Sequence, residues 1–419
     1  MAPFAELAQR VMDYCDELGK ISQSLDYLDR RYLSQEHRQA NELVSQWARL
    51  GNMHTWQDAA GNFWCRSSCE DINAPRFLIG SHLDTVPNGG KYDGMLGVVL
   101  PIVFMQYCHQ HNITFPFHVD IIGFGDEEGT RFGSTLLGSR ALTGKWQSEW
   151  AELRDVHNIK LAQALQTFGL SFDKVKNAQL SPDNILGYFE VHIEQGPVLE
   201  ANDLPVGIVS AIAGARRFMF SLEGLAGHAG TVPMALRQDS LVAASEMIVA
   251  IEKKALQAGL VATIGKIENG PNGVNVISGN TRFSLDIRSD NDELRDQTVS
   301  DILDSCMNIA QRRGVNLSYE QTHSAPAVSC DERLQKELEH AIVAQNIVPM
   351  RLFSGAGHDA MAMADLCPVA MLFMRCDKGI SHNPKEAICV EDVSATLAVF
   401  NDFMHKLSAD SYSNNSEVA

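Results

Sequence analysis

The chain has 419 residues, of which 45% are hydrophobic and 21% charged, and this is enough apolar material for two domains or for one large domain with an insertion. No window approaches the roughly 18 consecutive apolar residues of a membrane span, and the N-terminus lacks the basic start and apolar core of a secretory signal. We therefore expect a cytoplasmic protein, whose nine cysteines would be reduced thiols. The net charge of −18 argues against a nucleic-acid or anionic-membrane surface, which would need basic patches.

The N-terminal half reads as alternating helices and strands. Apolar residues at helical spacing predict an amphipathic helix over residues 1–20. Two short apolar runs, 76–80 and 118–125, predict buried strands, and the segment between them, 94–111, reads as a buried helix. This alternation favours a mostly parallel sheet with helices on both faces.

The pattern changes near Gly214, where polar and apolar residues alternate as in half-exposed strands. Strand and helix patterns follow in the order β-α-β-β-α-β, which is typical of small ferredoxin-like α+β domains. The two helices are expected at about 239–258 and 292–313, with Asn291 as the N-cap of the second, and the segment 260–268 reads as one strand.

After about residue 327 the chain returns to helix and strand patterns, including a buried strand over 368–376. The predicted fold class is therefore an α/β domain with a mostly parallel central sheet, interrupted by an inserted α+β domain. We expect the α/β domain to comprise 1–211 and 328–419, and the insertion to comprise 212–327.

The stretch "GSHLDTVPNGGKYDG" (80–94) places metal-competent side chains directly after a predicted strand. His82 and Asp84 are two positions apart, so in extended backbone they point to the same face, where one could bind a metal while the other orients it by a hydrogen bond. Asp93 follows a glycine-rich loop that lets the chain fold back toward His82. The alternative is a polar loop with incidental acids.

A second stretch, "GDEEGTRFGS", begins where the strand 118–125 ends. Glu127 and Glu128 are adjacent carboxylates that repel each other, and burial raises that cost. A metal ion beside them would relieve it, with one glutamate binding the ion and the other carrying a proton during catalysis. The alternative is a pair of solvated turn acids.

Two further histidines complete a possible metal-binding set. His192 lies in "YFEVHIEQGPVLE" and His382 lies in "KGISHNPKE", although a lone histidine in such a stretch is more often a core residue. Three imidazoles and two carboxylates without a thiolate suit zinc, manganese or cobalt. Five ligands exceed the need of one tetrahedral zinc and fit two metals, about 3.5–4 Å apart, that share a bridging carboxylate.

These stretches together resemble the co-catalytic zinc family of aminoacylases and carboxypeptidase G. Within that family the chain is similar to the branch of allantoate amidohydrolases and N-carbamoyl-L-amino-acid hydrolases. The resemblance extends from position 80 to 384, so it covers nearly the whole chain. The matching stretches are "GSHLDTVPNGGKYDG", "DEEGTRFGS", "LLGSRALTG", "HIEQGPVLE", "GHAGTVPMALRQD", "PNGVNVISG", "SGAGHDA" and "GISHNP".

The resemblance implies two divalent metal ions per subunit, Zn²⁺ or Mn²⁺ or Co²⁺. His82 and His192 would bind one ion, and Asp93 would bridge it to the other. Glu128 and His382 would complete the second ion. Every implied ligand position is filled in this chain.

The resemblance also implies the catalytic and substrate-binding residues. Glu127 would be the general base, and His228 would reach into the partner subunit's site and polarise the substrate carbonyl. Asn275 and Arg288 would hold the substrate carboxylate. The residues alone, however, favour Arg288 as a surface arginine paired with Asp286 or Asp290, and His228 could equally be a loop residue. The pocket would also be lined by Gln195, Gly357 and His358.

The implied activity is hydrolysis of a linear ureido or amide C–N bond in a small carboxylate-bearing substrate, either allantoate, with release of ammonia and CO₂, or an N-carbamoyl-L-amino acid. The expected assembly is a homodimer in which His228 and Asn275 act across the interface. One alternative is an aminoacylase or dipeptidase of the same family, which "HIEQGP" and "SGAGHDA" disfavour. Another is a non-catalytic ligand-binding protein on the same fold, which the complete ligand set with Glu127 disfavours.

Overall fold

The computed structural model describes the backbone of residues 2–416 and the side chains of residues 4–409. Contacts within the chain divide it into two compact units. The larger unit comprises 1–210, 330–352 and 357–419, and the smaller unit comprises 211–329 and 353–356. Whether each unit behaves as an independent domain stays a prediction.

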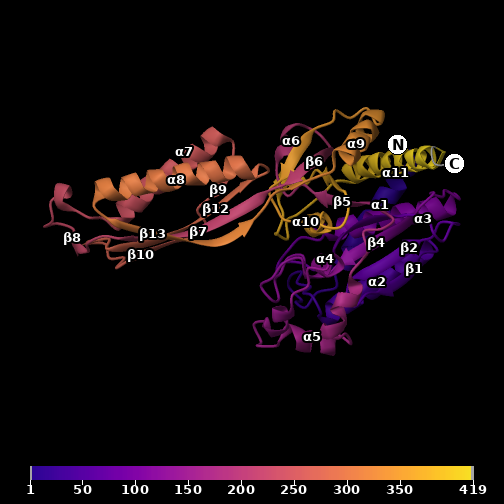
Figure 1. Cartoon of the computed structure of the whole chain (residues 1–419), viewed down its shortest axis with the longest axis horizontal. Coiled ribbons are helices and arrows are strands. Elements are labelled where there is room, and N and C mark those ends of the chain that lie inside the picture. Colours follow the sequence, from indigo (N-terminus) through magenta and orange to yellow (C-terminus); the bar gives the residue numbers. More distant parts are fainter. Residues whose placement is uncertain (1, 417–419) are drawn as a thin grey trace. The chain divides into compact units, whose positions relative to one another are not determined.

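The larger unit is built on a mixed β-sheet (Figure 1). In sheet order the strands are β1 (His54–Gln57), β2 (Phe63–Ser67), β4 (His118–Phe124), β3 (Arg76–His82), β5 (Ile185–Ile193), β16 (Val369–Met374), β6 (Val206–Ile212) and β14 (Val328–Ser329), and β15 (Arg351–Ser354) also pairs with β6. The neighbours β4, β3, β5 and β16 run parallel, whereas β1 with β2, β2 with β4, β16 with β6, and β6 with β14 are antiparallel.

The predicted mostly parallel sheet is therefore wrong at its edges. Parallel neighbours need a long crossover, whereas a short connection produces an antiparallel pair. The turn between β1 and β2 is short, and the Asp58 carboxylate closes it by accepting the N–H groups of Ala60 and Asn62. The strands over 76–80, 118–125 and 368–376 are confirmed as β3, β4 and β16.

Helices supply the other half of the larger unit's core. The predicted N-terminal helix and the buried helix over 94–111 are confirmed as α1 and α3. Almost every residue of α3 is buried, in agreement with its apolar character on all sides. No helix in the described part of the chain is both long and apolar enough to cross a membrane. The helices are α1 (Ala2–Leu18), α2 (Gln35–Leu50), α3 (Met95–Gln110), α4 (Leu137–Leu142), α5 (Leu161–Thr167), α6 (Val198–Ala201), α9 (Glu332–Ala344), α10 (Asp359–Met363) and α11 (Val390–Ser416).

The smaller unit is an antiparallel sheet with two helices. Asn291 caps α8 as predicted, because its side chain accepts the Leu294 N–H at 3.0 Å. The segment predicted as one strand over 260–268 forms two short strands, β9 and β10. The sheet order is β10-β12-β7-β13, and β9 pairs with β12. The strands of this sheet and its two helices are β7 (Gly214–Glu223), α7 (Ser240–Ala258), β9 (Val261–Thr263), β10 (Ile267–Gly270), β12 (Asn280–Ser289), α8 (Asp292–Arg313) and β13 (Asn316–Ala325).

One face of this antiparallel sheet is covered by α7 and α8 (Figure 1). Burial alternates along β12, as the sequence pattern predicts for a strand with one solvated face. The buried rings of Phe220 and Phe283 stack with centroids 4.8 Å apart, so the two central strands share one apolar cluster under the helices. The smaller unit therefore has a hydrophobic core of its own.

A buried histidine in the larger unit should make its stability sensitive to acid. His37, in α2, is fully buried, and its Nδ1 accepts the Leu33 N–H at 3.0 Å. Burial, reinforced by nearby arginines, lowers the pKa of His37 to about 3. The unfolded chain therefore binds a proton at His37 as the pH falls below about 6.5, whereas the folded chain does not, so stability falls with pH.

We expect the free energy of unfolding to fall by about 2 kcal/mol more in the wild-type protein than in His37→Gln between pH 7 and pH 5. Urea unfolding at the two pH values measures this difference, and other titrating groups cancel because both proteins contain them. Equal losses in the two proteins would contradict the prediction.

Candidate metal centre

The predicted metal ligands and Glu127 lie where parallel strands of the larger unit end. His82 is the last residue of β3, and His192 is next to the last residue of β5. The carboxyl ends of parallel strands share one edge of a sheet, which is where ligands bind in open α/β folds. The loops that follow β3, β4 and β16 carry Asp93, Glu127, Glu128 and His382.

Three buried side chains form the inner half-site: His82, Asp93 and His192. The Asp93 Oδ1 lies 3.6 Å from the His82 Nε2 and 3.2 Å from the His192 Nε2. Gly94, at φ 72°, lets the loop pack against His82, because a Cβ at this position would collide with the imidazole ring. The three side chains offer ligand atoms within 4.8 Å of one another, so they could hold one ion.

The other oxygen of Asp93 belongs to an outer half-site, formed with Glu128 and His382. The His382 Nε2 lies 3.2 Å from the Asp93 Oδ2 and 3.4 Å from the Glu128 Oε1. The His382 side chain is 51% exposed, whereas those of His82 and His192 are 2% and 1% exposed. The two oxygens of one carboxylate thus divide between two groups of side chains, which is the arrangement of a bridging ligand.

The spacing of these atoms fits divalent metals. Two ligands about 2.0–2.1 Å from a tetrahedral ion lie roughly 3.3 Å apart, close to the contacts of Asp93 in both half-sites. The His192 Nε2 is buried and has no hydrogen-bond partner, although it lies 3.2 Å from a carboxylate oxygen. A buried imidazole nitrogen without a partner is costly unless something binds it.

Backbone carbonyls fix the orientation of both inner imidazoles. The His82 Nδ1 lies 2.9 Å from the Asp84 carbonyl oxygen, and the His192 Nδ1 lies 2.9 Å from the Ile193 carbonyl oxygen. Each Nδ1–H is therefore donated to the backbone, and each Nε2 lone pair faces Asp93. The Asp84 carboxylate was expected to orient His82, but its Oδ1 lies 3.8 Å from the Nδ1, and the Asp84 carbonyl takes this role.

The Asp84 carboxylate instead holds the loop after β4. Its Oδ1 accepts the Glu127 N–H at 3.1 Å, and its Oδ2 accepts the Glu128 N–H at 3.3 Å. The Glu127 Oε2 lies 4.0 Å from the His82 Nε2, so this carboxyl group stands beside the inner half-site. The adjacent Glu128 contacts His382, so the two glutamates have different surroundings.

The carboxyl groups of the centre differ in the direction in which their surroundings shift the pKa. Burial raises the pKa of Glu127 well above its usual value, against the opposing effect of His82. Burial likewise raises the pKa of Glu128 to about 7. Burial also acts to raise the pKa of Asp93, but the three imidazoles around its carboxylate outweigh this effect and hold the pKa well below the usual range. Asp93 is therefore an anion, and Glu127 is a group that could hold a proton.

Two further aspartates, Asp126 and Asp359, are buried near the centre. Both carboxyl oxygens of Asp126 lack a hydrogen-bond partner, and burial raises the pKa of each group well above its usual value. Asp126 also has a positive φ of 63°. None of the groups of described residues that could hold a metal includes Asp126.

The structure brings Gln195 and His358 to the centre. The Gln195 Nε2 donates to the Asp93 Oδ2 at 3.0 Å, so this side chain contacts a predicted ligand directly. The His358 ring meets the His192 ring edge-on with centroids 4.5 Å apart. A Cβ at Gly357 would lie 3.8 Å from the Glu127 Oε1, so a glycine at this position leaves space beside the predicted base.

Two more groups have ligand atoms that lie close together: His82 with Glu127 and Glu128, and Glu190 with His192 and His358. The Glu190 carboxylate, however, already accepts hydrogen bonds from the Ser81 and Tyr188 hydroxyls and from a backbone N–H. Its lone pairs are thus engaged by donors, and we assign it no ion.

The three remaining predicted site residues belong to the smaller unit. His228 lies in β8 (Gly227–His228), which pairs with β11 (Val276–Ile277). The Asn275 carbonyl accepts the N–H of the residue after His228 at 3.0 Å, so Asn275, which directly precedes β11, lies beside His228, and both residues are exposed.

Arg288 is engaged with an aspartate of its own strand. Its Nε and Nη2 donate to the two carboxylate oxygens of Asp286 at 2.8 and 3.0 Å, and its Nη1 donates to the Gly355 carbonyl. The alternative of a surface pairing with Asp286 is therefore realised in the structure. A role in substrate binding stays a prediction.

Sequence reasoning missed Ser381 and Glu386, and it gave the Asp84 carboxylate a different task. Ser381 precedes a predicted ligand, and Glu386 lies four positions beyond that ligand, but nothing in the local pattern distinguishes them from ordinary loop residues. Their contacts are with segments far away in the chain, so only the folded structure reveals them.

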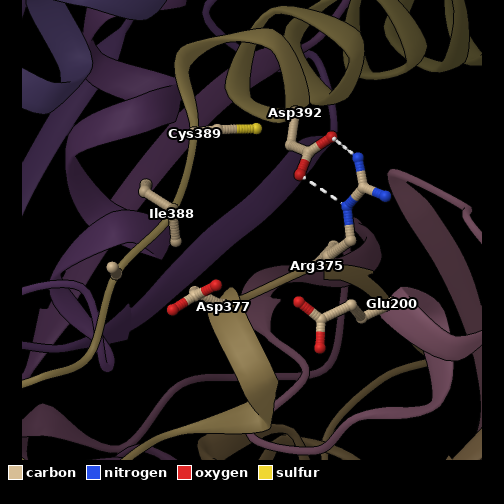
Figure 2. Close-up of a pocket in the computed structure, with 7 residues that line it drawn as sticks. Glu200, Arg375, Asp377, Ile388, Cys389 and Asp392 are labelled. Atoms are coloured by element: carbon tan, nitrogen blue, oxygen red, sulfur yellow. Dashed lines mark hydrogen bonds and ion pairs between the residues drawn. The ribbon is translucent and has the colours of Figure 1, made fainter.

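A separate pocket of about 320 Å³ lies beside the chain that follows β16 (Figure 2). The Arg375 guanidinium forms a fork with Asp392, with two contacts of 2.8 Å, and also donates to Asp203 at 3.0 Å. Glu200 and Asp377 line the same pocket. Because its arginine is already paired and its other charged groups are acidic, this pocket disfavours a carboxylate-bearing ligand.

A mixed α/β sheet with imidazoles and carboxylates at its carboxyl edge defines a class of proteins that hold divalent metals. The chain belongs to peptidase family M20/M25/M40, whose family model matches residues 78–406.

Comparison with known proteins shows relatives of matching length. The chain is 38% identical over 391 residues to an N-carbamoyl-L-amino-acid amidohydrolase of Pseudomonas sp. (strain NS671), which covers 92% of this chain and 94% of the relative. It is 37% identical over 425 residues to allantoate deiminase 2 of Glycine max, and the match covers 94% of this chain and 88% of the relative. Among solved structures, an amidase of the hydantoinase/carbamoylase family from Burkholderia multivorans superposes with a TM-score of 0.90 at 27% identity. The superposition covers 96% of this chain and 98% of the amidase.

Proposed function

We propose that this protein is a metal-dependent amidohydrolase that cleaves the C–N bond of a linear ureido group in a small carboxylate-bearing substrate, either allantoate or an N-carbamoyl-L-amino acid. The names of its relatives support this substrate class. The observation that carries the proposal is the division of the Asp93 oxygens between two imidazole groups, with Glu127 beside them.

Five side chains would hold the two ions, Zn²⁺ or Mn²⁺ or Co²⁺, at the inner and outer half-sites. When bound, such ions supply Lewis acidity and lower the pKa of a water toward neutrality. Glu127 would take the proton of the attacking water at its carboxylate and deliver it to the leaving nitrogen. With a ureido substrate the products are ammonia and a carbamate, which loses CO₂.

The smaller unit would recognise the substrate. Arg288 donates three of its five N–H groups, to Asp286 and to the Gly355 carbonyl, so two N–H groups remain for a ligand carboxylate. Asn275 would add a hydrogen bond to the same carboxylate, and His228 would stabilise the oxyanion of the tetrahedral intermediate. The exposure of His228 and Asn275 supports this role, because their side chains are open to a ligand.

Ammonia release after loading with Mn²⁺ tests the proposal. The substrates are allantoate, several N-carbamoyl-L-amino acids, N-acetyl amino acids and dipeptides, and the free amine is measured for the last two. We expect ammonia from one or both ureido classes. Turnover of only the acetyl amino acids or dipeptides would contradict the proposal and favour an aminoacylase or dipeptidase.

We also propose a homodimer in which the smaller unit, a ferredoxin-like lid and dimerisation domain, supplies His228 and Asn275 to the partner subunit's site. The strand order β10-β12-β7-β13, with two helices on one face, supports the comparison with ferredoxin-like domains. We place the protein in the cytoplasm, a location that its nine free cysteines support.

If His228 acts in the partner's site, two inactive variants should restore each other. Glu127→Ala and His228→Ala, mixed under conditions of subunit exchange, should recover about a quarter of the wild-type activity, because half of the dimers are mixed and each has one intact site. The control pair is Glu127→Ala with His192→Ala, in which every site keeps one defect. Absence of recovery in the first pair would count against action across the interface.

A further inference from the structure

A buried carboxyl group that the proposed mechanism does not use closes the loop bearing Asp93. Glu386 is 4% exposed, and its Oε1 accepts the N–H groups of Tyr92 at 2.8 Å and Asp93 at 3.1 Å. Gly90 makes room for it, because a Cβ at this position would collide with the Glu386 carboxyl group. Glu386 therefore fixes the backbone from which the Asp93 side chain extends.

Ser381 connects this carboxyl group to the Asp93 side chain. The Ser381 Oγ lies 3.1 Å from the Glu386 Oε2 and 2.9 Å from the Asp93 Oδ2. The Gln195 Nε2 donates to the same Oδ2 at 3.0 Å and lies 3.2 Å from the Ser381 Oγ. Contacts of Glu386, Ser381 and Gln195 thus hold both the backbone and the side chain of Asp93.

These contacts act on only one of the two Asp93 oxygens. The Oδ2 faces His382 at 3.2 Å, whereas the Oδ1 faces the imidazoles of His82 and His192. Ser381 directly precedes His382, so one short segment carries both the outer imidazole and the hydroxyl that holds the outer oxygen. A turn from the Asn383 carbonyl to the Glu386 N–H, at 3.0 Å, closes that segment.

The inner half-site has a different support. Its two imidazoles are held by strand ends and by carbonyls of their own neighbourhood, Asp84 and Ile193. Neither Ser381 nor Glu386 makes a hydrogen bond to the side chain of an inner imidazole among the contacts described. Loss of these two groups should therefore affect the half-sites unequally.

We propose that Ser381 and Glu386 are positioning residues for the outer half-site, which hold the Asp93 Oδ2 in place for the second ion while the inner half-site binds its ion without them. This inference rests on the two-ion centre of the proposed function but not on the identity of the substrate. Removing a hydrogen-bond partner of a ligand typically weakens metal binding by about 10–100-fold.

Manganese titration of the metal-free protein measures the two half-sites separately. The number of bound ions is followed by the free Mn²⁺ signal in electron paramagnetic resonance, and a spin-coupled spectrum reports a pair of neighbouring ions. We expect Ser381→Ala to bind the first ion as the wild-type protein does and the second about 10–100-fold more weakly, with a corresponding delay of the coupled spectrum. Excess Mn²⁺ should restore kcat.

Two further variants separate positioning from general destabilisation. Ser34→Ala removes a buried hydroxyl in the same unit that caps α2 by accepting the His37 N–H and contacts no predicted ligand. This variant should bind both ions as the wild-type protein does. Glu386→Gln keeps an oxygen for the two backbone N–H groups and an amide that can donate to the Ser381 hydroxyl, so it should bind the second ion within a few-fold of the wild-type affinity.

Several results would overturn the inference. These are a Ser381→Ala protein that binds both ions normally, that loses both equally, or that binds the second more tightly, since a tighter ion would mean that the hydroxyl only withdraws charge from Asp93. A Glu386→Gln protein as weak as Ser381→Ala would show that the charge matters and not the position. A wild-type protein that takes up one ion refutes the two-ion centre and this inference with it, whereas two ions without ammonia release refute only the proposed reaction.

Discussion

Replacing Glu127 with glutamine should lower kcat by about 10²–10⁴-fold while both metal ions stay bound. Glutamine has nearly the same shape as glutamate, but it cannot accept the proton of the attacking water. The Glu127 carboxyl group lies 4.0 Å from the His82 Nε2, whereas Asp93 lies 3.2 Å from the His192 and His382 imidazole nitrogens, so neutralisation of Glu127 should leave the five ligands in place. Steady-state kinetics at saturating Mn²⁺, together with metal analysis, measure both effects.

The neighbouring glutamate provides the matched control. Glu128→Gln is the same substitution one position further on, but the Glu128 Oε1 lies 3.4 Å from the His382 Nε2 in the outer half-site. We expect this variant to lose the second ion and to regain activity as the Mn²⁺ concentration rises. If Glu127→Gln lost metal, or if its kcat recovered with added Mn²⁺, Glu127 would be a ligand and not the general base.

Replacing Asp93 with alanine should remove both ions and abolish activity. Asp93 lies 3.2 Å from an imidazole nitrogen through each of its oxygens, to His192 through Oδ1 and to His382 through Oδ2. Its loss takes a ligand from each half-site at once, so metal binding should weaken by more than the roughly 10–100-fold that follows loss of a ligand's hydrogen-bond partner. Metal analysis after desalting and Mn²⁺ titration measure the loss.

The matched control for Asp93→Ala is His382→Ala. That change removes a ligand from the outer half-site alone, so one ion should remain per chain. If Asp93→Ala also kept one tightly bound ion, Asp93 would serve a single half-site and the bridging assignment would be wrong. Thermal unfolding without metal shows whether either variant has lost its fold.

The local structure was largely predictable because hydrophobic periodicity depends on nearby residues. The alternation along β12 and the apolar character of α3 are visible in short windows, and the N-cap at Asn291 is a single side chain next to its helix. The antiparallel edges of the large sheet were not predictable in this way. Strand direction depends on which strands become neighbours, and this is decided by packing.

In the candidate centre, too, some features could be predicted from the local sequence and others could not. The ligands could be proposed from the sequence because metal-competent side chains lie at or after apolar strands and because the stretches together resemble one family. The pairing of Arg288 with Asp286 was foreseen only as an alternative, since a fork of N–H groups fits either a neighbouring aspartate or a substrate carboxylate. The task of the Asp84 carboxylate was missed because it binds backbone N–H groups, which leave no trace in residue type.

The sequence by itself determined which side chains are the candidate metal ligands, since imidazole and carboxylate groups recur in several stretches that together resemble one family. Only the tertiary structure decided how they are shared: which oxygen of Asp93 faces which imidazole, and that Glu386 holds the loop of Tyr92 from 294 positions away. The physical reason is that ligand geometry depends on contacts between segments distant in the chain, and a hydrogen bond across such a distance is specified by the fold as a whole and by no local pattern.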